Sequence, residues 1–271
     1  MCAPPDEYRD PGTPRAAKET EERIRAADGV DIRMFLAEPA HGLEKGAVLI
    51  IHDIWGYTDF YKDLARRIAT EGYAAALVDL FAREGDLPAG VQPPTRVPTP
   101  EDRARMGPAM DRGAKVSDEQ AMGDLQAAVD ELRRRGAPRV VIWGFCSGGR
   151  LAYVAAARLR GLNGAVAYYG FLKAEPPRAA PLDIAGEIKV PLLGVFGGAD
   201  QGIPADQIAE FERRLESSGK DFAIKTYPGA PHGFLRYGAS EHADAIADAL
   251  KRTFAFFART LYDRETTRSF S

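Results

Sequence analysis

The stretch Val140-Val141-Ile142-Trp143-Gly144-Phe145-Cys146-Ser147-Gly148-Gly149 decides the fold of this 271-residue chain. Its four leading apolar residues predict a strand buried on both faces, and the apolar spacing from Leu151 onward predicts a helix. Glycines on both sides of Cys146 permit a sharp turn, because glycine removes the clash that a side chain would make there. The segment therefore predicts a strand, a tight turn and a helix, with the Cys146 sulfur raised above the sheet.

Short apolar runs alternate with helically spaced segments along the rest of the chain. We expect strands at Ala47–Ile51, Ala74–Val78, Val140–Trp143, Ala165–Tyr169, Pro191–Phe196 and, more weakly, Phe222–Tyr227. We expect helices at Tyr61–Thr70, Asp118–Arg134, Gly149–Leu159, Ala205–Ser217 and Glu241–Leu261. This alternation predicts an α/β fold of three layers, the architecture of the α/β-hydrolases, in which helices cover both faces of a mostly parallel twisted sheet.

Three parts of the chain differ in character. Residues 1–20 are rich in proline and charge without apolar periodicity, which predicts an extended or mobile arm. Residues 21–265 are expected to form a single α/β-hydrolase domain, opening with a hairpin whose turn is Asp28-Gly29. Within it, residues 84–116 have no clear period and follow a strand's carboxyl end. They are expected either to fold over a pocket or to form a surface excursion.

Composition excludes several classes of function. The chain has 36 Lys and Arg against 39 Asp and Glu, and a net charge of -3 indicates neither a nucleic-acid nor a membrane partner. Its apolar runs are far shorter than the ~18 residues that span a bilayer. Two cysteines and four histidines predict no disulfide framework, no metal site and no organic cofactor. The N-terminus lacks a secretory pattern, so we expect a cytoplasmic protein, and the state of association is left open.

Three candidate catalytic residues each follow a predicted strand. A helix N-terminus favours the thiolate form of Cys146, and a nucleophilic thiol needs an oriented base. His232 lies on a Gly/Pro-rich loop and Asp200 directly follows a strand, so the order Cys146…Asp200…His232 is the nucleophile–acid–base order of α/β-hydrolases. Asp206 is the rival acid, although its place in a helix's first turn suits capping. The backbone N–H groups of Ile54 and Ser147 are the candidate oxyanion donors.

Six motifs in this order resemble the dienelactone hydrolase family, the cysteine branch of the α/β-hydrolases. They are His-Asp-Ile-Trp-Gly at 52–56, Asp-Leu-Phe-Ala-Arg at 79–83, Gly-Phe-Cys-Ser-Gly-Gly at 144–149, Tyr-Tyr-Gly at 168–170, Gly-Gly-Ala-Asp at 197–200 and His-Gly-Phe at 232–234. They lie within residues 29–257, most of the chain.

The resemblance implies roles for individual residues. Cys146 would be the nucleophile, His232 the general base and Asp200 the residue that orients it. Arg83 and Arg236 would hold a substrate carboxylate, which a guanidinium fork matches well.

Two further positions in the expected substrate pocket depart from the family's pattern. Asp53 stands where the family commonly has Glu, a carboxylate linked to the protonation of the thiol. Trp55 replaces a smaller aromatic residue and would narrow the pocket.

The resulting hypothesis is a hydrolase of small, carboxylate-bearing lactones or esters that works through a Cys–His–Asp triad and a thioester intermediate. Two alternatives stay open. One is a general carboxylesterase with no preference for a substrate carboxylate. The other is a non-catalytic or redox-sensing protein on a hydrolase scaffold. The predicted acid–base pair argues against it, because a redox sensor does not need an imidazole oriented by a carboxylate.

Overall fold

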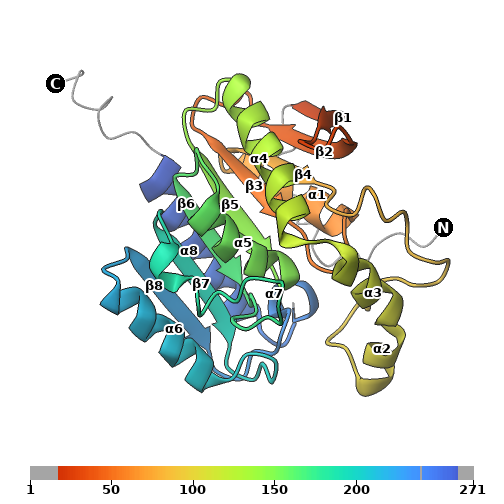
Figure 1. Cartoon of the computed structure of the whole chain (residues 1–271), viewed down its shortest axis with the longest axis vertical. Helices are drawn as coiled ribbons and strands as arrows, with labels where there is room; N and C mark the ends of the chain where they lie inside the picture. The colour runs from red at the N-terminus through yellow and green to blue at the C-terminus, as the bar shows by residue number, and fades with distance from the viewer. Residues whose placement is uncertain (1–17, 239, 262–271) are drawn as a thin grey trace.

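One eight-stranded sheet organises the chain (Figure 1). The computed structural model describes residues 18–238 and 240–261. Within them the strand order is β1-β2-β4-β3-β5-β6-β7-β8. The strands are β1 (Lys18–Arg25), β2 (Asp31–Glu38), β3 (Ala47–Ile51), β4 (Ala74–Val78), β5 (Val140–Phe145), β6 (Gly164–Tyr168), β7 (Leu192–Gly197) and β8 (Phe222–Tyr227).

Helices connect the strands and lie on both faces of the sheet. They are α1 (Asp59–Thr70), α2 (Pro100–Arg105), α3 (Gly107–Lys115), α4 (Asp118–Arg134), α5 (Ser147–Arg158), α6 (Ala205–Ser217), α7 (Phe234–Tyr237), α8 (Ala243–Leu261) and the short 3₁₀ helix η2 (Ala185–Glu187). In Figure 1, α4, α5 and α6 lie in front of the sheet and α1 and α8 behind it. No helix in the described ranges is long and apolar enough to cross a membrane.

The central strands explain why their sequences are continuous apolar runs. Every residue of β3, β4, β5 and β6 is buried, because helices cover both faces. Strands β3 to β8 pair in parallel, so their carboxyl ends meet at one edge. The three-layer α/β architecture predicted from the sequence is confirmed. Strand β5 extends two residues beyond the predicted Trp143 and ends directly before Cys146.

An antiparallel hairpin precedes the parallel sheet. Strands β1 and β2 pair along their whole length, and Gly29 turns the chain with φ 83°. The expected arm of residues 1–20 needs correction, because Lys18 to Thr20 already pair with β2. Residues 1–17 lie outside the described residues.

The excursion at 84–116 contains two helices that sequence periodicity did not reveal. Thr99 caps α2 by accepting a hydrogen bond from the Asp102 N–H, while the Asp102 carboxylate accepts one from the Thr99 N–H at 3.0 Å. Pro100 at the first helical position suits this start. These helices are too short to show a hydrophobic period, so capping residues were the available signal.

Arg83 joins three separate parts of the fold. Its Nε and Nη2 atoms donate to Asp28 in the hairpin turn at 2.9 and 2.8 Å. Its Nη1 and Nη2 atoms donate to Asp124 on α4 at 2.8 and 2.9 Å. The Asp124 side chain is only 1% exposed, so Arg83 neutralises a buried carboxylate.

Replacing Arg83 should therefore destabilise the fold. We expect Arg83→Met to lower the free energy of unfolding by about 3 kcal/mol, because it leaves the buried Asp124 charge without a partner. Urea unfolding measures the loss. Arg213→Met on α6, which removes an exposed ion pair with Glu210, is the matched control and should cost about 0.5 kcal/mol or less. The double variant Arg83→Met/Asp124→Leu should regain stability, and a loss equal to the single variant's would contradict this account.

Candidate active site

The turn that carries Cys146 is forced by close backbone packing. Cys146 has φ 56° and ψ -116°, a left-handed conformation rare for a side-chain-bearing residue. A Cβ added at Gly144 would lie 2.0 Å from the Gly148 carbonyl oxygen, and one added at Gly148 would lie 2.4 Å from the His52 carbonyl oxygen. The glycines thus let the first turn of α5 pack directly on the end of β3, with the thiol at the helix N-terminus.

Asp200 and His232 form a hydrogen-bonded pair. The His232 Nδ1 atom lies 2.6 Å from Asp200 Oδ2, and the Asp200 side chain is 2% exposed. The other carboxylate oxygen accepts the Gly202 N–H at 2.9 Å. The pair forms because the His232 loop lies against the end of β7: a Cβ at Gly197 would sit 2.4 Å from the Ala230 carbonyl oxygen. Asp200 therefore fixes the imidazole's orientation and leaves Nε2 free.

The His232 ring is flanked by two aromatic side chains, and the charge of Cys146 affects its pKa. Its centroid lies 5.1 Å from that of Phe171, nearly parallel, and 5.2 Å from that of Tyr169. Burial lowers the pKa of His232, but the charge of Cys146 and the hydrogen bond to Asp200 outweigh burial and raise the pKa to about 10. Within residues 18–238 and 240–261, the Nε2 atom of His232 is buried and has no hydrogen-bond partner. The structure thus brings the three predicted triad residues together, and His232 lies close enough to Cys146 for the cysteine's charge to raise its pKa.

The two candidate oxyanion donors lie on segments in contact with each other. Ser147 is the first residue of α5, where backbone N–H groups have no partner within the helix. Ile54 lies in the turn after β3, and its N–H has no backbone acceptor in the described part of the chain. Because Gly148 packs on the His52 carbonyl, these segments are adjacent.

Asp53, Arg236 and Trp55 form one buried group beside the three candidate catalytic residues. Asp53 Oδ2 lies 3.3 Å from Arg236 Nη1, and both side chains are 8% exposed. Burial lowers the pKa of Arg236, but the charge of Asp53 raises it above its usual range. Asp53 Oδ1 accepts the Trp55 N–H at 2.9 Å, and the Trp55 indole donates to the Tyr237 hydroxyl at 2.7 Å. Among the residues that the structure describes, this one contact between Arg236 Nη1 and Asp53 Oδ2 leaves most of the guanidinium's donors without a carboxylate partner.

Arg83, by contrast, is not placed as the sequence suggested. All four of its hydrogen bonds in the described part of the chain go to Asp28 and Asp124. Its guanidinium fork is occupied on both sides, so it is not available to a substrate carboxylate in this structure. The physical reason is that two acidic residues from distant elements converge on it.

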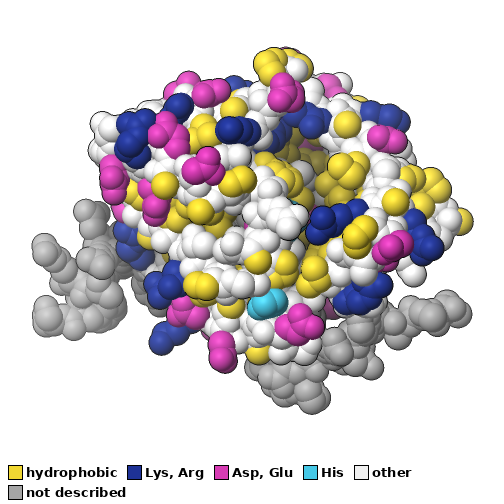
Figure 2. Space-filling model, turned by 90° about the horizontal axis from the view of Figure 1, so that it is seen from below, with side chains coloured by type: hydrophobic (Ala, Val, Ile, Leu, Met, Phe, Trp, Pro, Cys, Tyr) yellow, Lys and Arg dark blue, Asp and Glu magenta, His cyan; other side chains and the backbone are white. Residues whose placement is uncertain are grey.

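A cavity of about 640 Å³ lies between Trp55 and the excursion. It is lined by Trp55, residues 89–96, Asp102, Ala104, Arg105 and Pro108. Figure 2 shows a hollow on this side of the molecule, ringed by hydrophobic side chains with Lys and Arg at its margin. Twelve of the thirteen lining residues belong to the excursion itself, and Trp55 is the other. That the excursion folds over the substrate pocket stays a prediction. No group of three or more His, Cys, Asp or Glu in residues 18–238 and 240–261 is arranged to hold a metal ion.

Two residues at the site escaped sequence reasoning. His52 lies buried behind the loop that carries Ile54, and Arg112 on α3 donates to the Trp55 carbonyl at 3.0 Å. Both act on backbone groups, which residue type does not reveal. The available signal for His52 was its place directly after a buried strand.

The comparisons with known proteins agree with this architecture. A family model described as "Dienelactone hydrolase family" matches residues 32–261. A protein of Methylorubrum extorquens named "Putative carboxymethylenebutenolidase" is 34% identical over 244 residues, covering 88% of this chain and 79% of that protein. One of the same name from Saccharolobus solfataricus is 33% identical over 256 residues, covering 86% and 96%.

A solved structure extends the likeness to three dimensions. It is titled as a putative dienelactone hydrolase of Klebsiella pneumoniae and superposes with a TM-score of 0.76 at 31% identity, covering 89% of this chain and 98% of that one. The resemblance suggested by the sequence motifs is confirmed. The chain belongs to the dienelactone hydrolase family and is a hydrolase that acts on lactone or ester bonds.

Proposed function

We propose that this chain hydrolyses small, carboxylate-bearing lactones or esters through a thioester on Cys146. The observation that carries the proposal is the Asp200–His232 pair, 2.6 Å long, beside a cysteine held at the strained start of α5. An imidazole with a pKa raised to about 10 is protonated at neutral pH. Cys146 and His232 would then rest as a thiolate–imidazolium pair, the reactive form of a cysteine nucleophile.

Acylation begins when the thiolate attacks the substrate carbonyl. A carbon–sulfur bond forms, and the carbonyl oxygen becomes an oxyanion that the Ile54 and Ser147 N–H groups receive. The intermediate collapses as the carbon–oxygen bond to the leaving alkoxide breaks and the alkoxide takes the His232 Nε2 proton. In a lactone that alkoxide remains part of the acyl chain.

Deacylation uses the same imidazole as a base. Acylation removes the charge on sulfur, which is the largest influence that raises the pKa of His232. The neutral ring can then accept a proton from water as the water attacks the thioester. The carbon–sulfur bond breaks, the acid leaves, and the thiolate–imidazolium pair returns.

Removing the sulfur should abolish turnover. We expect Cys146→Ala to lower kcat for ester or lactone hydrolysis at least about 10³-fold, because no covalent route remains. Cys2→Ala, at the chain's other cysteine, is the matched control. Mass spectrometry of the acid-quenched wild-type reaction should find the acyl group on the peptide that contains Cys146. Unchanged hydrolysis by Cys146→Ala would remove the proposal.

The pH dependence of His232 tests the ion pair directly. With its pKa raised to about 10, the imidazolium persists through neutral pH and is lost as pH rises through that value. In Cys146→Ala the pKa should fall by about 1–3 pH units, because the facing negative charge is gone. Nitrogen-detected NMR of histidine-labelled protein measures the pKa of His232 in the wild type and in Cys146→Ala, with the His41 signals as an internal reference. Identical His232 titrations in the two proteins would show that no such pair exists.

Arg236 is the proposed contact for the substrate carboxylate. Its contact with Asp53 is a single one at 3.3 Å, and its guanidinium carbon lies 4.7 Å above the Phe60 ring. A carboxylate that displaced Asp53 would meet a buried, preoriented fork.

Removing this fork should discriminate between substrates. We expect Arg236→Gln to raise KM about 10-fold or more for an acidic ester, and less than about 3-fold for a neutral ester of the same alcohol. Steady-state kinetics on the ester pair measures the ratio. Arg103→Gln, an exposed arginine on α2, is the control. Equal changes for both esters would favour the general carboxylesterase.

A further inference from the structure

His52 is a fully enclosed histidine to which the mechanism above assigns no role. It directly follows β3, its exposed fraction is 2%, and its ring centroid lies 4.6 Å from that of Phe81. Burial lowers the pKa of His52 against the opposing charge of Asp79, so the ring is neutral at physiological pH. A neutral imidazole has one donor and one acceptor nitrogen, and the neighbours decide which is which.

The hydrogen bonds of His52 select a single tautomer. The Leu80 N–H donates to Nε2 at 3.1 Å, and a backbone N–H can only donate, so Nε2 carries no proton. The proton is therefore on Nδ1, which lies 2.8 Å from the Asp53 carbonyl oxygen and donates to it. The ring bridges the ends of β3 and β4 in one orientation.

The acceptor of that bond belongs to the peptide that presents the oxyanion donor. The Asp53 carbonyl and the Ile54 N–H are two ends of one planar trans peptide, so they point in opposite directions. The Gly56 N–H also donates to this carbonyl, at 3.1 Å. With the carbonyl held from behind by two donors, the Ile54 N–H is directed away from the ring.

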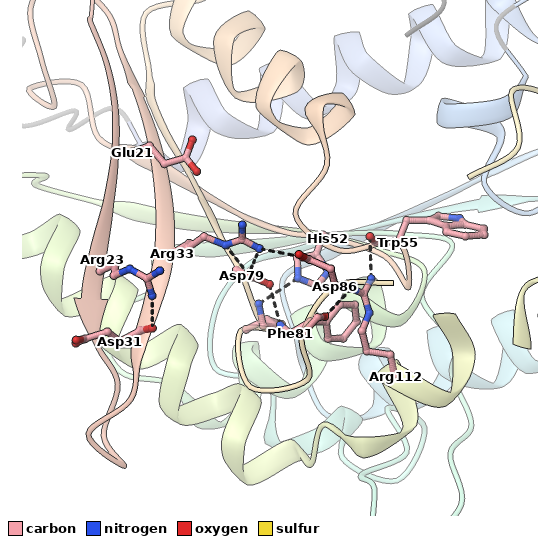
Figure 3. Close-up of polar contacts among 12 residues, drawn as sticks. Glu21, Arg23, Asp31, Arg33, His52, Trp55, Asp79, Phe81, Asp86 and Arg112 are labelled. Atoms are coloured by element: carbon pink, nitrogen blue, oxygen red, sulfur yellow. Dashed lines mark hydrogen bonds and ion pairs between the residues drawn. The ribbon is translucent and has the colours of Figure 1, made fainter. Parts of the chain in front are cut away.

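Hydrogen bonds and an ion pair around His52 fix the two backbone segments that its ring connects. Asp79, whose side chain is 3% exposed, accepts the Phe81 N–H at 3.0 Å and is bound by Arg33 at 2.7 Å, which anchors the segment carrying the Leu80 N–H. On the other side, Arg112 donates to the Trp55 carbonyl at 3.0 Å and lies over the Phe81 ring. Figure 3 shows His52 beside Asp79 and Phe81, with Arg112 reaching the main chain at Trp55.

We infer that His52 is a positioning residue for the oxyanion hole: its Nδ1–H bond to the Asp53 carbonyl sets the peptide plane that aims the Ile54 N–H at the developing oxyanion. The inference rests on the proposed function, in which Ile54 is one of the two donors. Preorganised donors act because they need no reorientation during the reaction, so loosening this peptide should slow acylation without weakening substrate binding.

Two nearly isosteric variants isolate the donor. Asn and Leu at position 52 both remove the acceptor for the Leu80 N–H, but only the Asn amide nitrogen can donate from near the Nδ1 position. We expect His52→Leu to lower kcat for ester hydrolysis about 100-fold with KM nearly unchanged, since loss of one oxyanion donor costs about 10²–10³-fold. His52→Asn should retain at least about 10-fold more activity than His52→Leu. The control is His41→Asn. The Nε2 atom of His41 lies 3.0 Å from the Gly72 carbonyl oxygen, so this variant also replaces a histidine that contacts a backbone carbonyl.

Alkylation of Cys146 by iodoacetamide separates the oxyanion hole from the thiol. Displacement of iodide forms no oxyanion, so the alkylation rate should be equal in wild type, His52→Asn and His52→Leu while ester acylation differs. Equal losses of kcat in the two variants would overturn the inference, as would an alkylation rate that falls in parallel with kcat. Both outcomes leave the proposed function intact, because that fails only if Cys146→Ala still hydrolyses esters.

The tautomer of His52 can also be measured in the wild-type protein, so this test does not depend on whether a variant folds. Histidine-selective nitrogen NMR at neutral pH should show the neutral His52 ring protonated on Nδ1 alone, with a slowly exchanging proton. Protonation of the neutral ring on Nε2 would overturn the inference.

Discussion

The backbone contact between the first turn of α5 and the carboxyl ends of β3 and β6 is the constraint on which the site depends. Added Cβ atoms at Gly148 and Gly149 would lie 2.4 Å from the His52 carbonyl oxygen and 2.7 Å from the Tyr168 carbonyl oxygen. No side chain fits in that space. The contact explains the left-handed Cys146, and it places the Ser147 N–H beside the loop that carries Ile54. The positions of the thiol and of both proposed oxyanion donors therefore follow from this one backbone contact.

Electrostatics at the site depends on a charge that the proposed reaction itself removes. The charge of Cys146 and the hydrogen bond to Asp200 raise the pKa of His232, so the proposed resting state pairs an imidazolium with a thiolate. In the proposed reaction, acylation converts the sulfur to a neutral thioester, so the same ring would become a better base when a base is required. Burial, by contrast, lowers the pKa of His52, although the charge of Asp79 and the hydrogen bond to the Asp53 carbonyl act in the opposite direction.

Two arginines that the family resemblance treats alike have different surroundings. Arg83 is bound by two carboxylates, Asp28 and Asp124, and holds the hairpin turn to α4. Arg236 contacts one carboxylate through one atom and lies among aromatic rings. A guanidinium recognises a substrate anion only when its donors can be released at low cost, so the first arginine stabilises the fold and the second remains the candidate for recognition.

The sequence by itself determined the layers of the fold and the order of the candidate triad. Strands β3 and β4 and helices α4 and α6 begin and end where sequence patterning predicts, because strands covered on both faces must be apolar throughout. The sequence singles out Cys146, Asp200 and His232 as candidates because each follows a strand of a parallel sheet. Tertiary structure alone decided the partners of Arg83, which lie 55 and 41 residues away, and the tautomer of His52. The partners of Arg83 and the tautomer of His52 depend on which carboxylates and backbone groups the folded chain brings together, and residue types alone do not predict this.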